Sequence, residues 1–137
     1  MLNFLKDWMS NKKTVLITGG SGFIGSHTVD LFINKGFKVR VIDNLVGGNE
    51  DNILQHKNNP DFEFINSDIN LISPSNSFFR DLSSVIHFAG IGDIVPSIED
   101  PVKYMETNVM GTINILEAAR KNKIGRFVYA ASSSCYG

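Results

Sequence analysis

Four glycines in the stretch TGGSGFIGS, residues 18–26, have the spacing of a loop that binds a diphosphate. Gly19 permits a tight turn, Gly22 has no β-carbon and lets a phosphate approach the backbone, and Gly25 allows a helix to pack closely. If a helix begins here, the N–H groups of Phe23 and Ile24 lie at its positive end, where they can bind phosphate. A plain turn between a strand and a helix is the alternative. An apolar strand before the loop and a helical pattern after it favour the nucleotide-binding interpretation.

Asp43 lies 18 residues after Gly25 and could hold the ribose of an adenine nucleotide. A carboxylate accepts hydrogen bonds from both ribose hydroxyls. It would repel a 2′-phosphate about 4 Å away by up to roughly 4 kcal/mol at an effective dielectric constant near 20. No lysine or arginine occurs between Asn44 and His56, and Arg40 is expected on the other face of its strand. We therefore expect NAD rather than NADP, unless Asp43 only forms a turn.

The stretch YAASSSCYG, residues 129–137, places three serines after an apolar run. Their hydroxyls could take part in catalysis, although serines at a strand end are more commonly turn residues. Cys135 is the sole cysteine, which excludes an internal disulfide and suits a reducing, cytoplasmic compartment. The three histidines are scattered over different elements, so no metal site is expected, and His87 is interpreted as a core residue.

Alternating strands and helices must position these residues. Short apolar runs predict strands at residues 14–18, 37–43, 62–65, 84–90 and 126–131. The first helix should follow the glycine loop and stop at Gly36, with an apolar face formed by Phe23, Ile24, Thr28, Leu31 and Phe32. Residues 66–81 allow either a loop or one helical turn. This order predicts an α/β fold with a doubly wound parallel sheet of the Rossmann type.

A long helix is expected before the last strand. Asp100 is a plausible N-cap, and Pro101 suits the first helical position. The predicted apolar stripe consists of Val102, Met105, Val109, Ile113 and Leu116. Gly111 lies within this helix, where glycine costs about 1 kcal/mol, and close approach to a neighbouring element would explain it.

Composition limits the remaining possibilities. Thirteen basic and fourteen acidic residues give a formal charge of −1, which offers no electrostatic basis for nucleic-acid binding. No apolar run approaches the roughly 20 residues of a membrane span. Residues 1–12 are expected to form an amphipathic extension that packs on the surface or on a partner, with a membrane-surface anchor as the alternative. Residues 13–137 are expected to form the nucleotide-binding domain.

From about Lys13 to Gly137 the chain resembles the extended short-chain dehydrogenase/reductase family, in its NAD-dependent nucleotide-sugar epimerase and dehydratase branch. The resemblance rests on six motifs in order: TGGSGFIGS (18–26), DNL (43–45), SDI (67–69), HFAG (87–90), TNVMGTINILEAAR (107–120) and YAASSSCYG (129–137). It implies a Rossmann fold, NAD as the cofactor and a nucleotide sugar as the substrate.

The resemblance also implies roles for single residues. Asp68 would meet the adenine amino group and Ile69 would cover the ring. The other residues implied in cofactor binding are Asn44, Phe88, Ala89, Gly90 and Asn108, although the position of Asn108 within a helix is also typical of a solvated or backbone-bonded residue. Ser132 takes the place of the family's catalytic serine, and Ser133 and Ser134 would lie beside the sugar or phosphate. Galactose-type epimerases usually carry a lysine where Gly92 stands, which leaves uronate, acetylhexosamine and dehydratase substrates open.

The family's chemistry also uses a Tyr-x-x-x-Lys pair beyond the serine strand. None of Tyr104, Tyr129 and Tyr136 has a lysine four residues later. We therefore expect an N-terminal portion, truncated after about the fifth strand, without the substrate domain and inactive alone. A non-catalytic NAD-binding or regulatory module, or a product that binds nothing tightly, remains open. Self-association through the last strand or the long helix is also expected.

Overall fold

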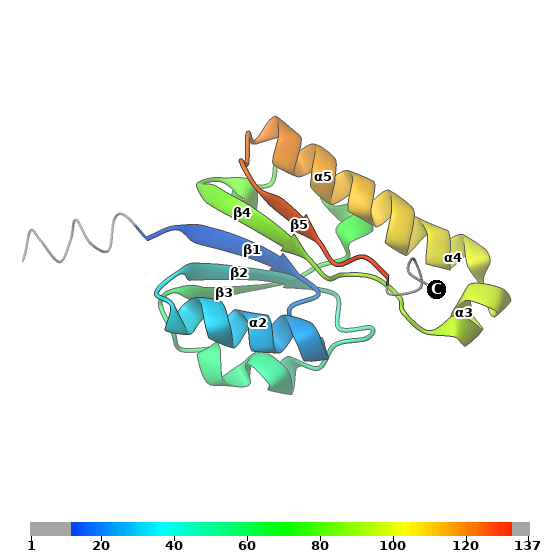
Figure 1. Cartoon of the computed structure of the whole chain (residues 1–137), viewed down its shortest axis with the longest axis horizontal. Helices are drawn as coiled ribbons and strands as arrows, with labels where there is room; N and C mark the ends of the chain where they lie inside the picture. The colour runs from blue at the N-terminus through cyan, green and yellow to red at the C-terminus, as the bar shows by residue number, and fades with distance from the viewer. Residues whose placement is uncertain (1–11, 133–137) are drawn as a thin grey trace, which may run out of the picture.

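A parallel sheet forms the centre of the computed structural model, which describes residues 12–132 (Figure 1). Its strands in this part of the chain are β1 (Thr14–Thr18), β2 (Lys38–Asp43), β3 (Phe62–Asn66), β4 (Leu82–His87) and β5 (Phe127–Tyr129). They lie in the order β3-β2-β1-β4-β5, and every neighbouring pair is parallel. The five predicted strands are confirmed: the bounds of β1 are as predicted, and those of the others shift by at most three residues. The expected extension lies outside the described residues, apart from its last residue.

Helices cover both faces of this sheet. On one face lie α2 (Phe23–Asn34) and the 3-10 segment η1 (Glu50–His56). On the other lie the 3-10 turns η2 (Ile69–Leu71) and η3 (Ser77–Phe79) and a long helix built from α4 (Pro101–Met105), the π-helical segment η4 (Glu106–Gly111) and α5 (Thr112–Lys121). A short helix, α3 (Ile94–Glu99), precedes α4. Figure 1 shows α2 and α5 on opposite sides of the strands, which confirms the doubly wound arrangement.

Two hydrophobic clusters hold these layers together. Successive side chains of a strand point to opposite faces. Val15 and Ile17 of β1 therefore pack with Val29 of α2, whereas Leu16 packs with Ile115 of α5. All five residues of β1 are buried. Each buried Val, Leu or Ile contributes about 1.5–3 kcal/mol relative to exposure, which explains why this strand is a continuous apolar run.

The long helix begins as predicted but buries a different face. Asp100 caps it, since its Oδ1 accepts a hydrogen bond from Lys103 N at 3.1 Å, and Pro101 follows. The predicted apolar stripe, however, is exposed by 41–66% (Val102, Met105, Val109, Ile113 and Leu116). Gly111, Ile115 and the small side chains of Ala118 and Ala119 are buried instead. The helix has apolar residues on two faces, and the face with the smaller residues approaches the sheet more closely.

The predicted apolar face of α2 is also wrong in part. Phe23, Ile24 and Leu31 are exposed by 79%, 63% and 50%. Gly25, Ser26 and Val29 are the buried residues. The reason is the close approach of the helix to the loop after β1, which places small residues against the sheet.

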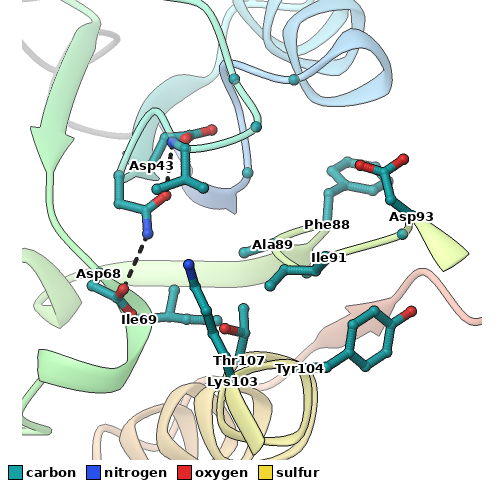
Figure 2. Close-up of a pocket in the computed structure, with 18 of the residues that line it drawn as sticks. Asp43, Asp68, Ile69, Phe88, Ala89, Ile91, Asp93, Lys103, Tyr104 and Thr107 are labelled. Atoms are coloured by element: carbon teal, nitrogen blue, oxygen red, sulfur yellow. Dashed lines mark hydrogen bonds between the residues drawn. The ribbon is translucent and has the colours of Figure 1, made fainter. Parts of the chain in front are cut away.

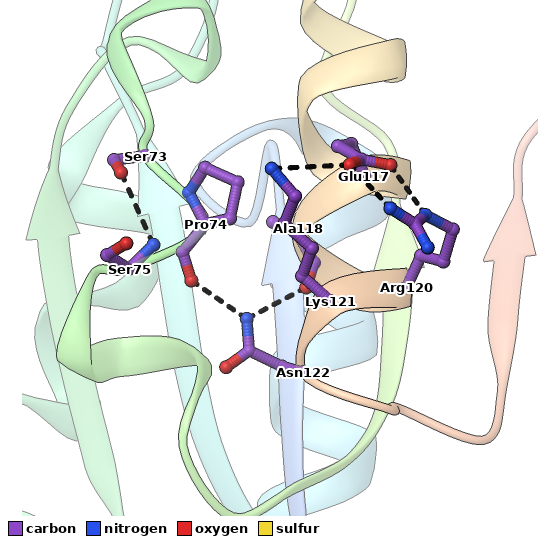
Figure 3. Close-up of polar contacts among 8 residues, drawn as sticks. All are labelled: Ser73, Pro74, Ser75, Glu117, Ala118, Arg120, Lys121 and Asn122. Atoms are coloured by element: carbon purple, nitrogen blue, oxygen red, sulfur yellow. Dashed lines mark hydrogen bonds and ion pairs between the residues drawn. The ribbon is translucent and has the colours of Figure 1, made fainter.

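The segment between β3 and β4 is fastened to the end of α5. The sequence left it open as a loop or a helical turn, and the structure contains η2 and η3. Between them, Pro74 O accepts a hydrogen bond from Asn122 Nδ2 at 2.8 Å, and the same amide also donates to Ala118 O at 2.8 Å (Figure 3).

Beside this contact, Glu117 pairs with Arg120 and Lys121. The hydrogen bond from Arg120 is the main cause that lowers the pKa of Glu117 to about 2.

Candidate functional site

A cavity of about 610 Å³ lies at the carboxyl ends of the strands, beside β1. Its volume is typical of small-molecule sites. Ligands of open parallel sheets bind where the strand order reverses, which here is the space after β1 between β2 and β4. Figure 2 shows side chains from the β2, β3 and β4 ends on one side and from α4 and η4 on the other.

The loop after β1 offers backbone donors to this cavity. Gly19 has a φ of +67°, and its N–H donates to Ile42 O at 2.8 Å. Gly22 is the N-cap of α2 and provides no capping side chain, and the first turn carries no acidic residue. A β-carbon on Gly25 would lie 2.1 Å from Gly19 O, so α2 approaches the loop as closely as glycine permits. The resulting helix N-terminus is suited to an anionic group.

Asp43 lies at the end of β2 with only 8% of its surface exposed. Its Oδ2 accepts a hydrogen bond from Ser21 N and its Oδ1 one from Leu45 N, both at 2.9 Å. Each oxygen keeps one acceptor site, so the carboxylate can still bind a diol. Arg40 is turned away from the cavity, because its guanidinium donates to Glu63 Oε2 at 2.7 Å and to two carbonyls near η3.

The loop that folds over Asp43 was not predicted from the sequence. Val46, Gly47 and Gly48 line the cavity. A β-carbon on Gly48 would lie 3.0 Å from Asp43 Oδ1, so a side chain there would crowd the carboxylate. Ser21 O fastens this loop by accepting hydrogen bonds from Asn49 and Asn52. The two adjacent glycines after the second strand are the sequence feature from which this loop could have been predicted.

Asp68 and Ile69 form the cavity wall at the end of β3. Asp68 Oδ2 accepts a hydrogen bond from Asn44 Nδ2 at 3.0 Å (Figure 2). Its Oδ1 accepts one from Asn70 N at 2.8 Å. Ile69 is 5% exposed and lies against Gly111, where a β-carbon would be 2.4 Å from Ile69 Cδ1. The prediction that close approach explains Gly111 is confirmed.

A buried hydrogen-bond chain through His87 joins the sheet to the long helix. His87 is 1% exposed, which confirms it as a core residue. Its Nδ1 lies 2.6 Å from Thr18 Oγ1 and its Nε2 lies 2.9 Å from Thr112 Oγ1. Thr112 Oγ1 donates to Asn108 O at 2.7 Å, while Thr18 Oγ1 accepts from Ala89 N at 3.3 Å.

These contacts determine the tautomer of His87. Because the single hydroxyl proton of Thr112 is directed to Asn108 O, His87 Nε2 must be the protonated nitrogen. His87 Nδ1 then accepts from Thr18, and every polar atom in the chain of hydrogen bonds has a partner. Burial lowers the pKa of His87 from 6.5 to about 4, so the ring is neutral at pH 7.

Asn108 fixes the backbone beside the cavity. Its Oδ1 accepts from Ile91 N at 2.7 Å and its Nδ2 donates to Ile91 O at 2.9 Å. The side chain lies beside Gly90, where a β-carbon would be 3.0 Å from Asn108 Oδ1. Asn108 thus pairs with both polar groups of one residue, as a neighbouring strand would. The π-helical segment that contains it was not predicted, and such segments are frequent at functional sites.

The cavity brings together most of the predicted cofactor-binding residues. It is lined by Gly19, Gly22, Asp43, Asn44, Asp68, Ile69, Phe88, Ala89 and Gly90. Phe23, Ile24, Gly25 and Asn108 lie outside its lining. Ser132 is exposed just after β5 and is also outside the lining, while Ser133 and Ser134 fall outside the described residues.

The residues present fit an adenine dinucleotide. A helix start without a capping side chain suits a diphosphate, Asp43 keeps acceptors for a diol, and the apolar side chain of Ile69 suits a flat ring. Within the part of the chain that the structure describes, no helix has the length and apolar character needed to cross a bilayer.

Comparison with known proteins finds enzymes named for sugar nucleotides among those similar to this chain. The model of the NAD dependent epimerase/dehydratase family matches residues 15–137. A putative UDP-glucose 4-epimerase of Methanocaldococcus jannaschii is 45% identical over 127 residues, which cover 90% of this chain and 39% of the relative. The chain thus spans about two fifths of that relative.

Solved structures agree with this comparison. The UDP-N-acetylglucosamine 4-epimerase of Methanobrevibacter ruminantium, in complex with UDP-N-acetylmuramic acid, superposes with a TM-score of 0.84 at 32% identity over 92% of this chain and 40% of that one. The UDP-glucose 4-epimerase of Thermus thermophilus, in complex with NAD, gives a TM-score of 0.75 at 34% identity. This superposition covers 87% of this chain and 37% of that one.

Acidification tests the His87 chain of hydrogen bonds. The unfolded protein takes up a proton at this histidine near pH 6.5, whereas the folded protein does so only near pH 4. The free energy of unfolding should therefore fall by about 3 kcal/mol between these pH values through His87 alone. Nitrogen-15 NMR at pH 5 should show a neutral His87 ring that is protonated at Nε2. The ring signals can be assigned to His87 because they disappear in the variant His87→Gln. A ring that titrates near pH 6.5, or is protonated at Nδ1, would contradict this assignment.

Proposed function

This chain belongs to the NAD-dependent epimerase/dehydratase family, and we propose that it forms the NAD-binding part of a nucleotide-sugar epimerase or dehydratase. The observation that supports this function best is that the uncapped start of α2 and the carboxylate of Asp43 belong to one cavity. The first can bind a diphosphate and the second a ribose diol, which are successive parts of the same dinucleotide.

The remaining walls would bind the two rings. Asp68 would accept a hydrogen bond from the adenine amino group, and Ile69 would cover the ring. The backbone at Phe88–Gly90 would lie beside the nicotinamide. Thr18 holds it at Ala89, and Asn108 holds the residue that follows it, Ile91. Phe23, Ile24 and Gly25 would contribute backbone N–H groups rather than side chains.

The proposed reaction begins with oxidation of a sugar hydroxyl. Bound NAD would accept the hydride from the sugar carbon. Ser132 would hydrogen-bond the sugar oxygen, with Ser133 and Ser134 beside the sugar or its phosphate. No tyrosine of this sequence precedes a lysine by four residues, so we propose that the base lies outside these 137 residues.

Calorimetric titration with NAD and NADP tests this function. We expect the chain to bind NAD more tightly than NADP, because Asp43 repels a 2′-phosphate. Asp43→Asn should reduce that preference by about tenfold, since it removes the charge but keeps the size of the side chain. Asp61→Asn, which removes a carboxylate outside the cavity lining, is the charge-matched control. Binding of neither dinucleotide, or equal binding of both by the unsubstituted chain, would contradict the proposal.

We also propose that the chain pairs with a second copy through the long helix. The supporting observation is that the five residues predicted as the apolar stripe of this helix are exposed. Val109 and Ile113 lie near its middle and are exposed by 41% and 48%. Contiguous apolar surface of this kind is typical of interaction sites. The edge strand β5, with Val128 and Tyr129 exposed, is the other candidate surface.

Sedimentation velocity distinguishes these surfaces. The unsubstituted chain should form a dimer at micromolar concentration, and Ile113→Glu should shift it to the monomer by placing a charge in the stripe. Val128→Glu on β5 is the matched variant and should leave the dimer intact. A monomer at all concentrations, or dissociation only by Val128→Glu, would contradict pairing through the helix.

A further inference from the structure

The cavity has an unbalanced set of charges. Among the described residues that line it, four carry carboxylates, namely Asp43, Asp68, Asp93 and Asp100. Lys103 is the one lysine or arginine among them. A dinucleotide brings a diphosphate with two negative charges into this acidic space, so a cation within reach should matter for its binding.

Lys103 is placed to supply that cation. It lies in the first turn of α4, where its backbone N–H is held by Asp100 Oδ1 at 3.1 Å. Figure 2 shows its side chain rising from the helix, with the amine directed into the space between Asp68 and Ala89. Within residues 12–132, none of the ion pairs involves this amine, although four carboxylates line the same cavity. The ammonium is therefore available to a ligand.

We propose that Lys103 binds the diphosphate of the dinucleotide from the side opposite the glycine loop. An ammonium has three donors and no acceptor, so it favours the phosphate oxygens over the adenine and ribose of the same ligand. The glycine loop supplies only backbone donors and a partial dipole charge, and residues 18–26 contain no lysine or arginine. Lys103 adds the full charge that this loop lacks. The inference rests on the proposed binding of NAD.

No local signal in the sequence identifies this residue. Lys103 lies 60 residues after Asp43, in a helix that the sequence predicts without indicating that it faces the glycine loop. Only the fold brings α4 across the cavity from the loop after β1. A second ligand, the nucleotide sugar, also carries a diphosphate, so the experiment must separate the two.

Titration calorimetry with four probes tests the proposal on the full chain. Lys103→Gln should lower the affinities for NAD and ADP-ribose by about tenfold, while the affinity for adenosine should change by no more than about twofold. Lys103→Arg should restore most of the loss, because it restores the charge. Lys121→Gln, which removes the same charge beside Glu117 and outside the cavity, should leave all affinities unchanged. Added NaCl should weaken NAD binding more steeply in the unsubstituted chain than in Lys103→Gln.

Several outcomes would overturn the assignment. Equal NAD affinity in Lys103→Gln and Lys121→Gln would exclude Lys103 as a ligand-binding residue while leaving the proposed function intact. An equal loss for adenosine would show contact with the nucleoside rather than the phosphates. A loss confined to UDP, the fourth probe, would assign Lys103 to the nucleotide sugar. No binding of NAD by the unsubstituted chain would overturn both proposals.

Discussion

The parallel register between β1 and β2 is the constraint on which the cavity depends. Thr18 pairs with Ile42, and the next residue, Gly19, donates its N–H to Ile42 O. This register places Asp43 directly beside the loop after β1, where Ser21 N binds its carboxylate. A slip of one residue would turn Asp43 to the other face of the sheet and separate it from the glycine loop. The site therefore follows from strand pairing before any ligand is considered.

Contacts that hold the fold also shape the site. His87 satisfies Thr18 and Thr112, and through them fixes the positions of Ala89 N and Asn108 O. Asn108 in turn holds the backbone of Ile91. The backbone beside the cavity is thus held by hydrogen bonds between neutral groups.

The sequence predicted those features that local chemistry determines. The five strands, the glycine loop, the Asp100 N-cap and the place of Asp43 all have short-range signals. The buried face of the long helix has no such short-range signal. Val109 and Ala118 lie on different apolar faces of this helix, and only packing against the sheet determines which face is buried. The π-helical segment and Lys103 were also missed, since both depend on contacts between segments far apart in the chain. The predicted roles of Ser132, Ser133 and Ser134 remain predictions.

Amide NMR of the chain with and without NAD tests the central claim most directly. If the dinucleotide lies across the ends of β1, β2 and β3, the amide signals of Gly22, Leu45 and Ile69 should shift together, with one affinity. Signals at the far end of the sheet, such as Lys38 and Ile124, should stay in place. Shifts confined to the far end, or none at saturating NAD, would contradict the account.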